Sequence, residues 1–250
     1  MSATAVKRVT TVLFDYGHTL MDFARPQELL VEAYHRINQR LEQELEAEVP
    51  SAARMLVEVS ERVDDEIGRS YRGGAEQEVD IASLYEDALS ALGMHLTPET
   101  VTWVIEHEQD AWLNGITASP HAIPVLEELK PRGFRLGIVS NAAFAPQSMR
   151  NQLESLELSQ YFDATVYSSE IGVRKPNRAI YESCVERLGG ANGGRVVFVG
   201  DRLREDVVGP RKLGFDAVLT HEFRQEDPAE WGIAVPVITS LDQLPALIAD

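Results

Sequence analysis

Three blocks with different hydrophobic patterns follow one another along the chain. The first is a run of β-branched and apolar residues, 9–15 (VTTVLFD), which predicts a buried strand that ends at an acid. The second block repeats apolar side chains at helical spacing. We expect its helices over residues 26–48, 52–67, 81–92 and 98–112. The third block alternates short apolar runs with amphipathic stretches, a pattern typical of parallel strands joined by crossover helices.

The third block begins at Ser119-Pro120 and, with the first strand, predicts an α/β fold. We expect strands over residues 134–140, 164–168, 196–200, 217–220 and 235–239, and helices over 120–131, 146–157, 176–188, 204–214 and 241–249. These elements form a doubly wound, mainly parallel, Rossmann-like sheet, into which the helical bundle is inserted after the first strand. We therefore expect two domains, an α/β core formed by residues 1–20 and 118–250 and a helical cap over residues 21–117.

The composition is that of a soluble globular chain, with 44% hydrophobic and 25% charged residues, but its net charge is −17. Residues 22–117 contain 21 acidic residues, seven arginines and no lysine, so −14 of this charge belongs to the helical insertion. Such a surface repels polyanions, and we expect neither a nucleic-acid partner nor a membrane partner. Solvated helix faces explain the acidity most simply; a device against highly anionic substrates is the alternative.

The cysteine content and the N-terminal segment both point to a cytoplasmic protein. The single cysteine, Cys184, forbids an intramolecular disulfide and fits a reducing compartment. The apolar run that ends at Asp15 is far shorter than an export signal or a membrane span requires. The sequence also has no Walker loop, His-Glu-x-x-His or Gly-x-Ser-x-Gly motif, which removes the simplest signatures of several common enzyme classes.

Polar residues stand at or just beyond the carboxyl ends of several predicted strands. They are Asp15 with Thr19, Ser140 with Asn141, Lys175, and Asp201 with Glu205 and Asp206. Each residue taken alone is typical of a turn, a helix cap or an exposed lysine. The carboxyl ends of parallel strands meet at one sheet edge, however, so we expect these side chains to converge there. Carboxylates, a lysine and hydroxyls in one place suit a hard cation and a phosphate.

Four segments in this order resemble the motifs of the haloacid dehalogenase superfamily, in the subgroup with a helical cap after the first strand. The segments are VLFDYGHTL at 12–20, IVSNA at 138–142, GVRKP at 172–176 and VVFVGDRLREDVVG at 196–209. The resemblance covers nearly the whole chain, and the insertion has the size of the cap and lies in the expected gap. It implies a hydrolase that acts on a small-molecule substrate, most simply a small phosphorylated metabolite.

The resemblance also implies a role for each matched residue. Asp15 is the expected nucleophile, which forms a covalent aspartyl intermediate. Thr19 and Ser140 are expected to donate hydrogen bonds to the transferring group, and Lys175 to neutralise its charge. Asn141 and His18 are assigned to substrate binding. The expected cofactor is Mg²⁺, bound by Asp15, the backbone carbonyl of Gly17, Asp201 and Asp206.

The chain departs from the phosphatase pattern at Gly17, where those enzymes carry a second aspartate. Glycine keeps the backbone carbonyl but loses the carboxylate for proton transfer, a function typically worth ~10²–10⁴ in rate. Three interpretations compete: a phosphatase with good leaving groups or another proton carrier, a hydrolase of carbon–halogen (2-haloacid dehalogenase-type) or carbon–phosphorus bonds, and a phospholigand-binding or regulatory protein with weak turnover. Phosphonate cleavage would need a Schiff-base lysine from the cap, and residues 22–117 contain no lysine.

His18 is the candidate proton carrier in the first interpretation, although a loop histidine with a local hydrogen bond is the simpler one. Against dehalogenation, the tripeptide Tyr16-Gly17-His18 does not match the dehalogenase form, and Asp201 is retained. We expect a Mg²⁺-dependent phosphoric monoester hydrolase, monomeric or homodimeric.

Overall fold

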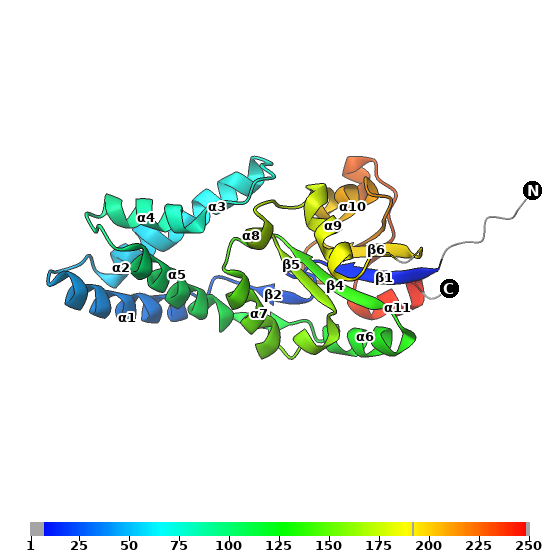
Figure 1. Ribbon diagram of the computed structural model, residues 1–250, viewed down its shortest axis with the longest axis horizontal. Coiled ribbons are helices and arrows are strands. Elements are labelled where there is room, and N and C mark those ends of the chain that lie inside the picture. The colour runs from blue at the N-terminus through cyan, green and yellow to red at the C-terminus, as the bar shows by residue number, and fades with distance from the viewer. Residues whose placement is uncertain (1–7, 192, 249–250) are drawn as a thin grey trace, which may run out of the picture. The chain divides into compact units, whose positions relative to one another are not determined.

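A computed structural model describes residues 8–191 and 193–248 of the chain, and its elements are labelled in Figure 1. Contacts divide these residues into two compact units. The α/β unit consists of the described residues up to Phe23, Thr117–Ala142, and the described residues from Leu153 onward. The helical unit consists of Ala24–Ile116 and Ala143–Gln152. The last residue of the helix expected over 241–249 lies outside the described residues.

The α/β unit is built on a six-stranded sheet with the order β5-β4-β1-β6-β7-β8, in which every neighbouring pair is parallel. The strands are β1 Val9–Phe14, β4 Arg135–Ser140, β5 Ala164–Tyr167, β6 Arg195–Gly200, β7 Asp216–Thr220 and β8 Val237–Ile238. In the register, Val12 of β1 lies between Leu136 and Val197. The central strands are buried on both faces, which explains their continuous apolar runs. The predicted α/β fold with a mainly parallel sheet is confirmed.

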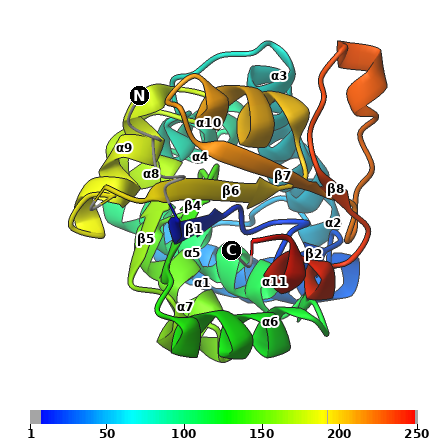
Figure 2. The same cartoon turned by 90° about the vertical axis from the view of Figure 1, so that its right-hand side faces the viewer.

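Helices cover both faces of this sheet. Figures 1 and 2 show α9 and α10 on one face and α6 and α11 on the other. The helices of this unit are α6 Ala122–Leu129, α8 Ser168–Ile171, α9 Arg178–Arg187, α10 Gly209–Arg211 and α11 Leu244–Leu247. Helix α9 approaches β4 at Gly137, where an added Cβ would lie 2.7 Å from the Sγ of Cys184. Glycine is thus needed for this close helix–strand packing.

Two short elements and one helix differ from the sequence expectation. Strands β2 Met21–Phe23 and β3 Ile116–Ala118 pair into a separate two-stranded sheet. With three residues each, they are too short to produce a recognisable alternation. The helix expected over 204–214 is a π-helical turn, Leu203–Val208, followed by the brief α10. Pro210, which lacks an amide hydrogen, interrupts a regular α-helix at this point.

The helical unit contains the four amphipathic stretches as helices around one apolar core. Its elements are α1 Gln27–Leu45, α2 Ala52–Met55, a π-helical turn Leu56–Glu61, α3 Arg62–Arg72, α4 Ile81–Ala91 and α5 Pro98–Leu113; α7 Pro146–Ser155 begins in this unit and ends in the α/β unit. The core includes Leu30, Ile37 and Val104. Asp80 accepts hydrogen bonds from the amides of Ala82 and Ser83, and Thr97 accepts one from the amide of Thr100, so both residues cap the first turn of their helices, α4 and α5. Within the described residues, no helix combines the length and apolar composition that a bilayer crossing requires.

Candidate active site

Three carboxylates meet at the carboxyl edge of the sheet. Asp15 directly follows β1, Asp201 directly follows β6, and Asp206 lies in the π-helical turn beyond β6. All three are buried, and one oxygen from each lies within 4.8 Å of the others. Gly200 allows this approach, because an added Cβ would lie only 2.4 Å from the Cγ of Asp206. The neighbouring strands β1 and β6 thus bring Asp15 together with Asp201 and Asp206, which lie 186 or more residues further along the sequence.

Lys175 lies between two of these carboxylates. Its Nζ is 2.7 Å from Oδ1 of Asp15 and 2.7 Å from Oδ1 of Asp206. Burial alone would lower the pKa of Lys175, but the two carboxylates override it and raise that pKa above its ordinary value. The lysine is therefore a permanent cation at the centre of the site.

Asn141 holds the backbone on which Lys175 stands. Its Oδ1 accepts a hydrogen bond of 2.7 Å from the amide of Lys175, and its Nδ2 donates one of 3.3 Å to the carbonyl of the same residue. Asn141, which was expected to bind substrate, thus uses both the oxygen and the nitrogen of its side-chain amide to bond the main chain of Lys175. Because the lysine cannot shift without breaking these bonds, Asn141 is suited to fix its position.

The two hydroxyl candidates lie on the loops and strand ends around this cluster. Ser140 is the last residue of β4 and is buried. Thr19 is fully buried, and its Oγ1 has no hydrogen-bond partner. A buried hydroxyl without a partner costs free energy unless something else binds it, so Thr19 is available to donate to a bound group.

Asp201 is bonded on one oxygen and open on the other. Its Oδ2 accepts a hydrogen bond of 2.7 Å from Nη1 of Arg224, while Oδ1 is buried without a partner. Burial and the neighbouring Asp15 raise the pKa of Asp201, and burial raises that of Asp206 although Lys175 opposes the rise. The sequence did not predict Arg224, although the loop after β7 opens at the same sheet edge as Asp201.

The donor set fits a small hard cation. Mg²⁺ prefers a few carboxylate oxygens supplemented by carbonyls and waters, and the cluster offers three carboxylates and one open buried oxygen, Oδ1 of Asp201. A divalent cation would also offset the repulsion that raises the pKa of Asp201. We therefore regard these aspartates as the residues that would hold Mg²⁺.

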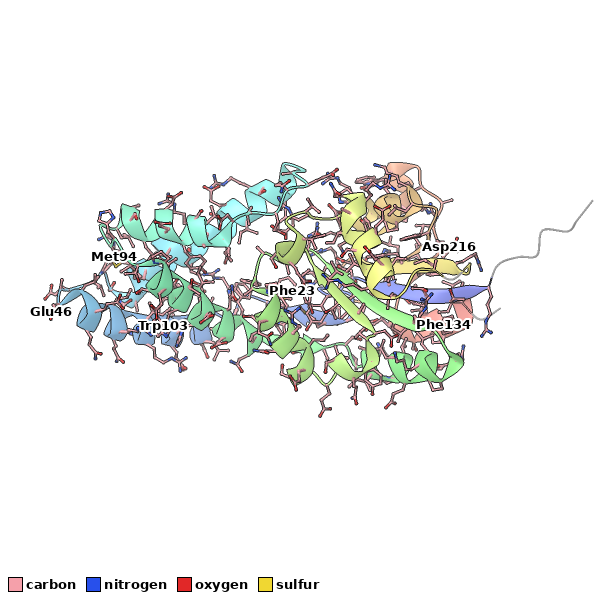
Figure 3. All side chains as sticks on the ribbon, viewed as in Figure 1. Phe23, Glu46, Met94, Trp103, Phe134 and Asp216 are labelled. Atoms are coloured by element: carbon pink, nitrogen blue, oxygen red, sulfur yellow. The ribbon has the colours of Figure 1, made fainter. Side chains whose placement is uncertain are left out.

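The loop after Asp15 places an aromatic ring where the second aspartate of the phosphatase pattern would stand. A Cβ added to Gly17 would lie 3.0 Å from Cε1 of Phe23, the last residue of β2 (Figure 3). His18 adopts a left-handed backbone with φ of 57° and stacks on Phe23 with ring centroids 4.4 Å apart. Its Nδ1 lies 2.9 Å from Oδ1 of Asp22. This contact is the local hydrogen bond expected of a loop histidine. Because it engages Nδ1, Nε2 is the nitrogen that would carry a proton if His18 acted as a proton carrier.

Comparison with known proteins gives the class to which this fold and this cluster belong. A family model described as haloacid dehalogenase-like hydrolase matches residues 9–214. The chain therefore belongs to the haloacid dehalogenase-like hydrolases, as the four motifs predict.

Individual relatives include a phosphatase and a dehalogenase. The chain is 32% identical to a glyceraldehyde 3-phosphate phosphatase of Methanothermobacter thermautotrophicus over 52% of this chain and 58% of that protein. It is 31% identical to (S)-2-haloacid dehalogenase 4A of Burkholderia cepacia over 54% of this chain and 56% of that protein. The chain thus spans less than two thirds of the length of either relative. A HAD phosphatase structure from Thermococcus onnurineus superposes with a TM-score of 0.61 at 25% identity, covering 96% of this chain and 98% of that one.

Proposed function

We propose that the chain is a Mg²⁺-dependent phosphoric monoester hydrolase that acts on a small phosphorylated metabolite through an aspartyl-phosphate intermediate. One observation carries the proposal: Lys175 bonds both Asp15 and Asp206 at 2.7 Å, while Asp201 completes an acidic cluster that could hold a metal cation. A phosphate needs such positive charge beside its nucleophile, because an anion must otherwise attack an anion.

The reaction divides into two displacements at phosphorus. In the first, the carboxylate of Asp15 attacks phosphorus, the bond from phosphorus to the ester oxygen breaks, and the alcohol leaves with a proton taken from water. In the second, a water molecule attacks the same phosphorus and gives a proton to solvent, and the bond from phosphorus to the Asp15 oxygen breaks. This step releases inorganic phosphate, restores the Asp15 carboxylate and balances the proton taken up in the first step. Asp15 is buried at the sheet edge, and its backbone amide donates a 2.8 Å hydrogen bond to the carbonyl of Val199, which fixes its position.

The other residues of the cluster would stabilise the charge that moves in these displacements. Lys175 holds one oxygen of Asp15 and leaves the other for attack, and it faces the phosphoryl oxygens as a compact cation. Thr19, with its unpartnered Oγ1, and Ser140 would donate hydrogen bonds to those oxygens. Bound Mg²⁺, held by Asp15, Asp201, Asp206 and the backbone carbonyl of Gly17, would supply Lewis-acid stabilisation of the phosphoryl charge.

Gly17 restricts the leaving groups that such an enzyme can expel quickly. Without a carboxylate at this position, the leaving alkoxide depends on water or on His18 for its proton. Burial lowers the pKa of His18, and the positive charge of Arg224 lowers it further. The imidazole is therefore mostly unprotonated at neutral pH, which makes it a weak proton donor. We therefore expect good leaving groups, such as enol or aryl phosphates and acyl phosphates, to react faster than simple alkyl phosphates.

The variant Gly17→Asp tests this reading of the loop. A large gain on alkyl phosphate esters would identify a phosphatase that lacks only its proton donor, whereas loss of an existing activity would identify a specialised enzyme. Because Phe23 lies 3.0 Å from the new Cβ, the substitution is made alone and together with Phe23→Ala, which gives the carboxylate room. His18→Ala is measured in parallel, and unchanged turnover in that variant would remove the histidine from the mechanism.

A 2-haloacid dehalogenase-type hydrolase is the second candidate, and Gly17 favours it because a departing halide needs no proton. In that reaction Asp15 would attack the halogenated carbon and form an ester. The retained Asp201 opposes this candidate, since its carboxylate adds buried negative charge that only a cation or a proton relieves. A phospholigand-binding protein with weak turnover is the third candidate, and the intact group of Asp15, Lys175 and Asp201 opposes it.

The deciding experiment assays phosphate esters and 2-haloacids side by side, each with Mg²⁺ and with a chelator. We expect phosphate release that requires Mg²⁺ and disappears in Asp15→Asn. Halide release that survives chelation, without phosphate release, would overturn the proposal in favour of a dehalogenase. Tight binding of inorganic phosphate without release from any ester would favour the binding protein.

A further inference from the structure

The charge of the site is offset by a second fixed cation besides Lys175. Lys175 bonds Asp15 and Asp206, whereas Asp201 bonds Arg224 through Oδ2 at 2.7 Å. Asp201 is fully buried, while the side chain of Arg224 is 30% exposed and reaches the cluster from the loop after β7. An arginine keeps its charge at every working pH, so the guanidinium is a fixed cation hydrogen-bonded to the carboxyl group of Asp201.

The loop that carries Arg224 is anchored on both sides of that residue. On one side, the carboxylate of Glu222 accepts hydrogen bonds from Oγ of Ser119 at 2.5 Å and from the amide of Leu241 at 2.8 Å. On the other side, Oε2 of Glu226 accepts a hydrogen bond of 2.6 Å from the amide of Leu203, which is two residues after Asp201. The loop that carries Arg224 is therefore fixed beside Asp201, which distinguishes this ion pair from one made by an arginine on an unanchored surface loop.

Arg224 also changes the charge balance of the site. Three carboxylates with Lys175 and Arg224 carry a net charge of −1 when all are ionised, and a divalent cation would change this to +1. A site with one positive charge in excess suits an incoming phosphate; without Arg224 the loaded site would be neutral.

We propose that Arg224 is a positioning residue with opposite effects on two affinities of the site. It competes with Mg²⁺ for Asp201, which lowers the affinity for Mg²⁺, and its positive charge raises the affinity for the phosphoryl anion. This inference rests on the proposed function. It predicts that removal of the guanidinium changes the two affinities in opposite directions. A residue that only supports the fold would weaken both when removed.

The test measures binding rather than turnover, by calorimetric titration of the full chain at pH 8 with Mg²⁺ alone and then with inorganic phosphate at saturating Mg²⁺. In Arg224→Met we expect Mg²⁺ to bind about tenfold more tightly, because a positive charge bonded directly to Asp201 is removed, and phosphate to bind about tenfold more weakly. Arg224→Lys, which keeps the charge, should stay within about threefold of the unmodified chain for both ligands.

Arg202→Met is the matched control. Arg202 is the residue after Asp201 and influences its pKa, but its side chain is exposed. Loss of the same charge there should change either affinity less than about threefold, since solvent screens it. Equal effects in Arg202→Met and Arg224→Met would overturn the role of the direct contact.

The remaining outcomes separate this inference from the proposed function. If the unmodified chain binds no Mg²⁺, the proposed function fails and the inference fails with it. If the unmodified chain binds Mg²⁺ and phosphate but Arg224→Met binds Mg²⁺ no more tightly, or loses affinity for both, only the inference fails.

Discussion

Both units bury carboxylates, but the two units differ in how completely hydrogen-bond donors match the carboxylate oxygens. In the helical unit, Glu108 is almost fully buried; its Oε1 accepts a hydrogen bond of 2.5 Å from Ser60, and its Oε2 accepts one from Tyr34. Arg25 donates to Ser60 and to Asp64 in the same cluster. Each oxygen of Glu108 is thus matched by a donor from a different helix, as a cross-link between helices requires.

The acidic cluster of the α/β unit is only partly matched by donors. Three carboxylates share Lys175 and Arg224, and Oδ1 of Asp201 is the one carboxylate oxygen among the described residues that is buried without a partner. Unmatched buried charge raises the free energy of the unliganded fold, and a bound cation and anion would recover that cost. A buried carboxylate with both oxygens hydrogen-bonded, such as Glu108, is suited to a structural role, whereas Asp201, with one partnerless oxygen, is suited to bind a ligand.

The largest expected effect follows from removing the central cation of the acidic cluster in the α/β unit. Lys175→Met should lower turnover of a phosphate ester by ~10³-fold or more, because both the nucleophile and the phosphoryl group lose their neutralising charge. Steady-state kinetics at saturating Mg²⁺ measures the effect. The matched control is Arg178→Met, three residues further along, where an exposed arginine pairs with Glu182 on the surface of α9; its turnover should equal that of the unmodified chain. More than a tenth of the original turnover in Lys175→Met would contradict a central role for the lysine.

The α/β cluster was largely predictable from the sequence because strand ends are strong signals. Asp15, Ser140 and Asp201 each follow an apolar run, and parallel strands place such positions at one edge. Asp206 was also expected there from the fourth motif. The strand pattern does not show which side chains form hydrogen bonds or ion pairs with one another. Neither the contact between Asn141 and the backbone of Lys175 nor the ion pair between Arg224 and Asp201 was therefore predicted.

The helical cluster was not predictable in the same way. Helical periodicity predicted the apolar faces of α1 and α5, and the structure confirms them. It gave no sign that Glu108, four residues after Val104, also faces inward. A glutamate on a helix in an acidic segment is ordinarily exposed, and only the tertiary arrangement of Ser60 and Tyr34 provides its hydrogen bonds.

Replacing one carboxylate in each cluster tests the comparison through stability. Glu108→Gln should lower the free energy of unfolding by about 1–3 kcal/mol, since the new amide hydrogens face a donor. Asp201→Asn, measured without metal at pH 8, should leave stability unchanged or raise it, because a buried charge repelled by Asp15 is removed. Denaturant unfolding in the presence of a chelator measures both values.

The control for this pair is Glu58→Gln, which breaks an exposed ion pair with Arg54 and should change stability by less than about 0.5 kcal/mol. If Asp201→Asn destabilised the metal-free chain as much as Glu108→Gln does, both clusters would be structural and the distinction between them would be lost.

The smallest expected effect is a pH dependence that belongs to the helical cluster. Burial raises the pKa of Asp64 to about 6, with nearby Glu108 adding to the rise and Arg25 opposing it. The unfolded chain releases this proton near pH ~3.9, so between about pH 4 and pH 6 the folded state binds more protons. The free energy of unfolding should therefore fall as the pH rises through this window and level off above it. In Asp64→Asn, the contribution of this carboxyl to the pH dependence of the free energy of unfolding should be absent.

Tryptophan fluorescence during urea unfolding measures this slope, because Trp103 and Trp112 both pack against the apolar core of the helical unit. The control is Asp80, which caps α4 and whose pKa is lowered by hydrogen bonds from Ser83. Its contribution has the opposite sign, rising with pH and confined to values below about pH 4. Asp80→Asn should consequently leave the slope between pH 4 and pH 6 intact. A slope that persists unchanged in Asp64→Asn would show that another group titrates in this window and that the carboxylate of Asp64 carries no unrelieved charge in the fold.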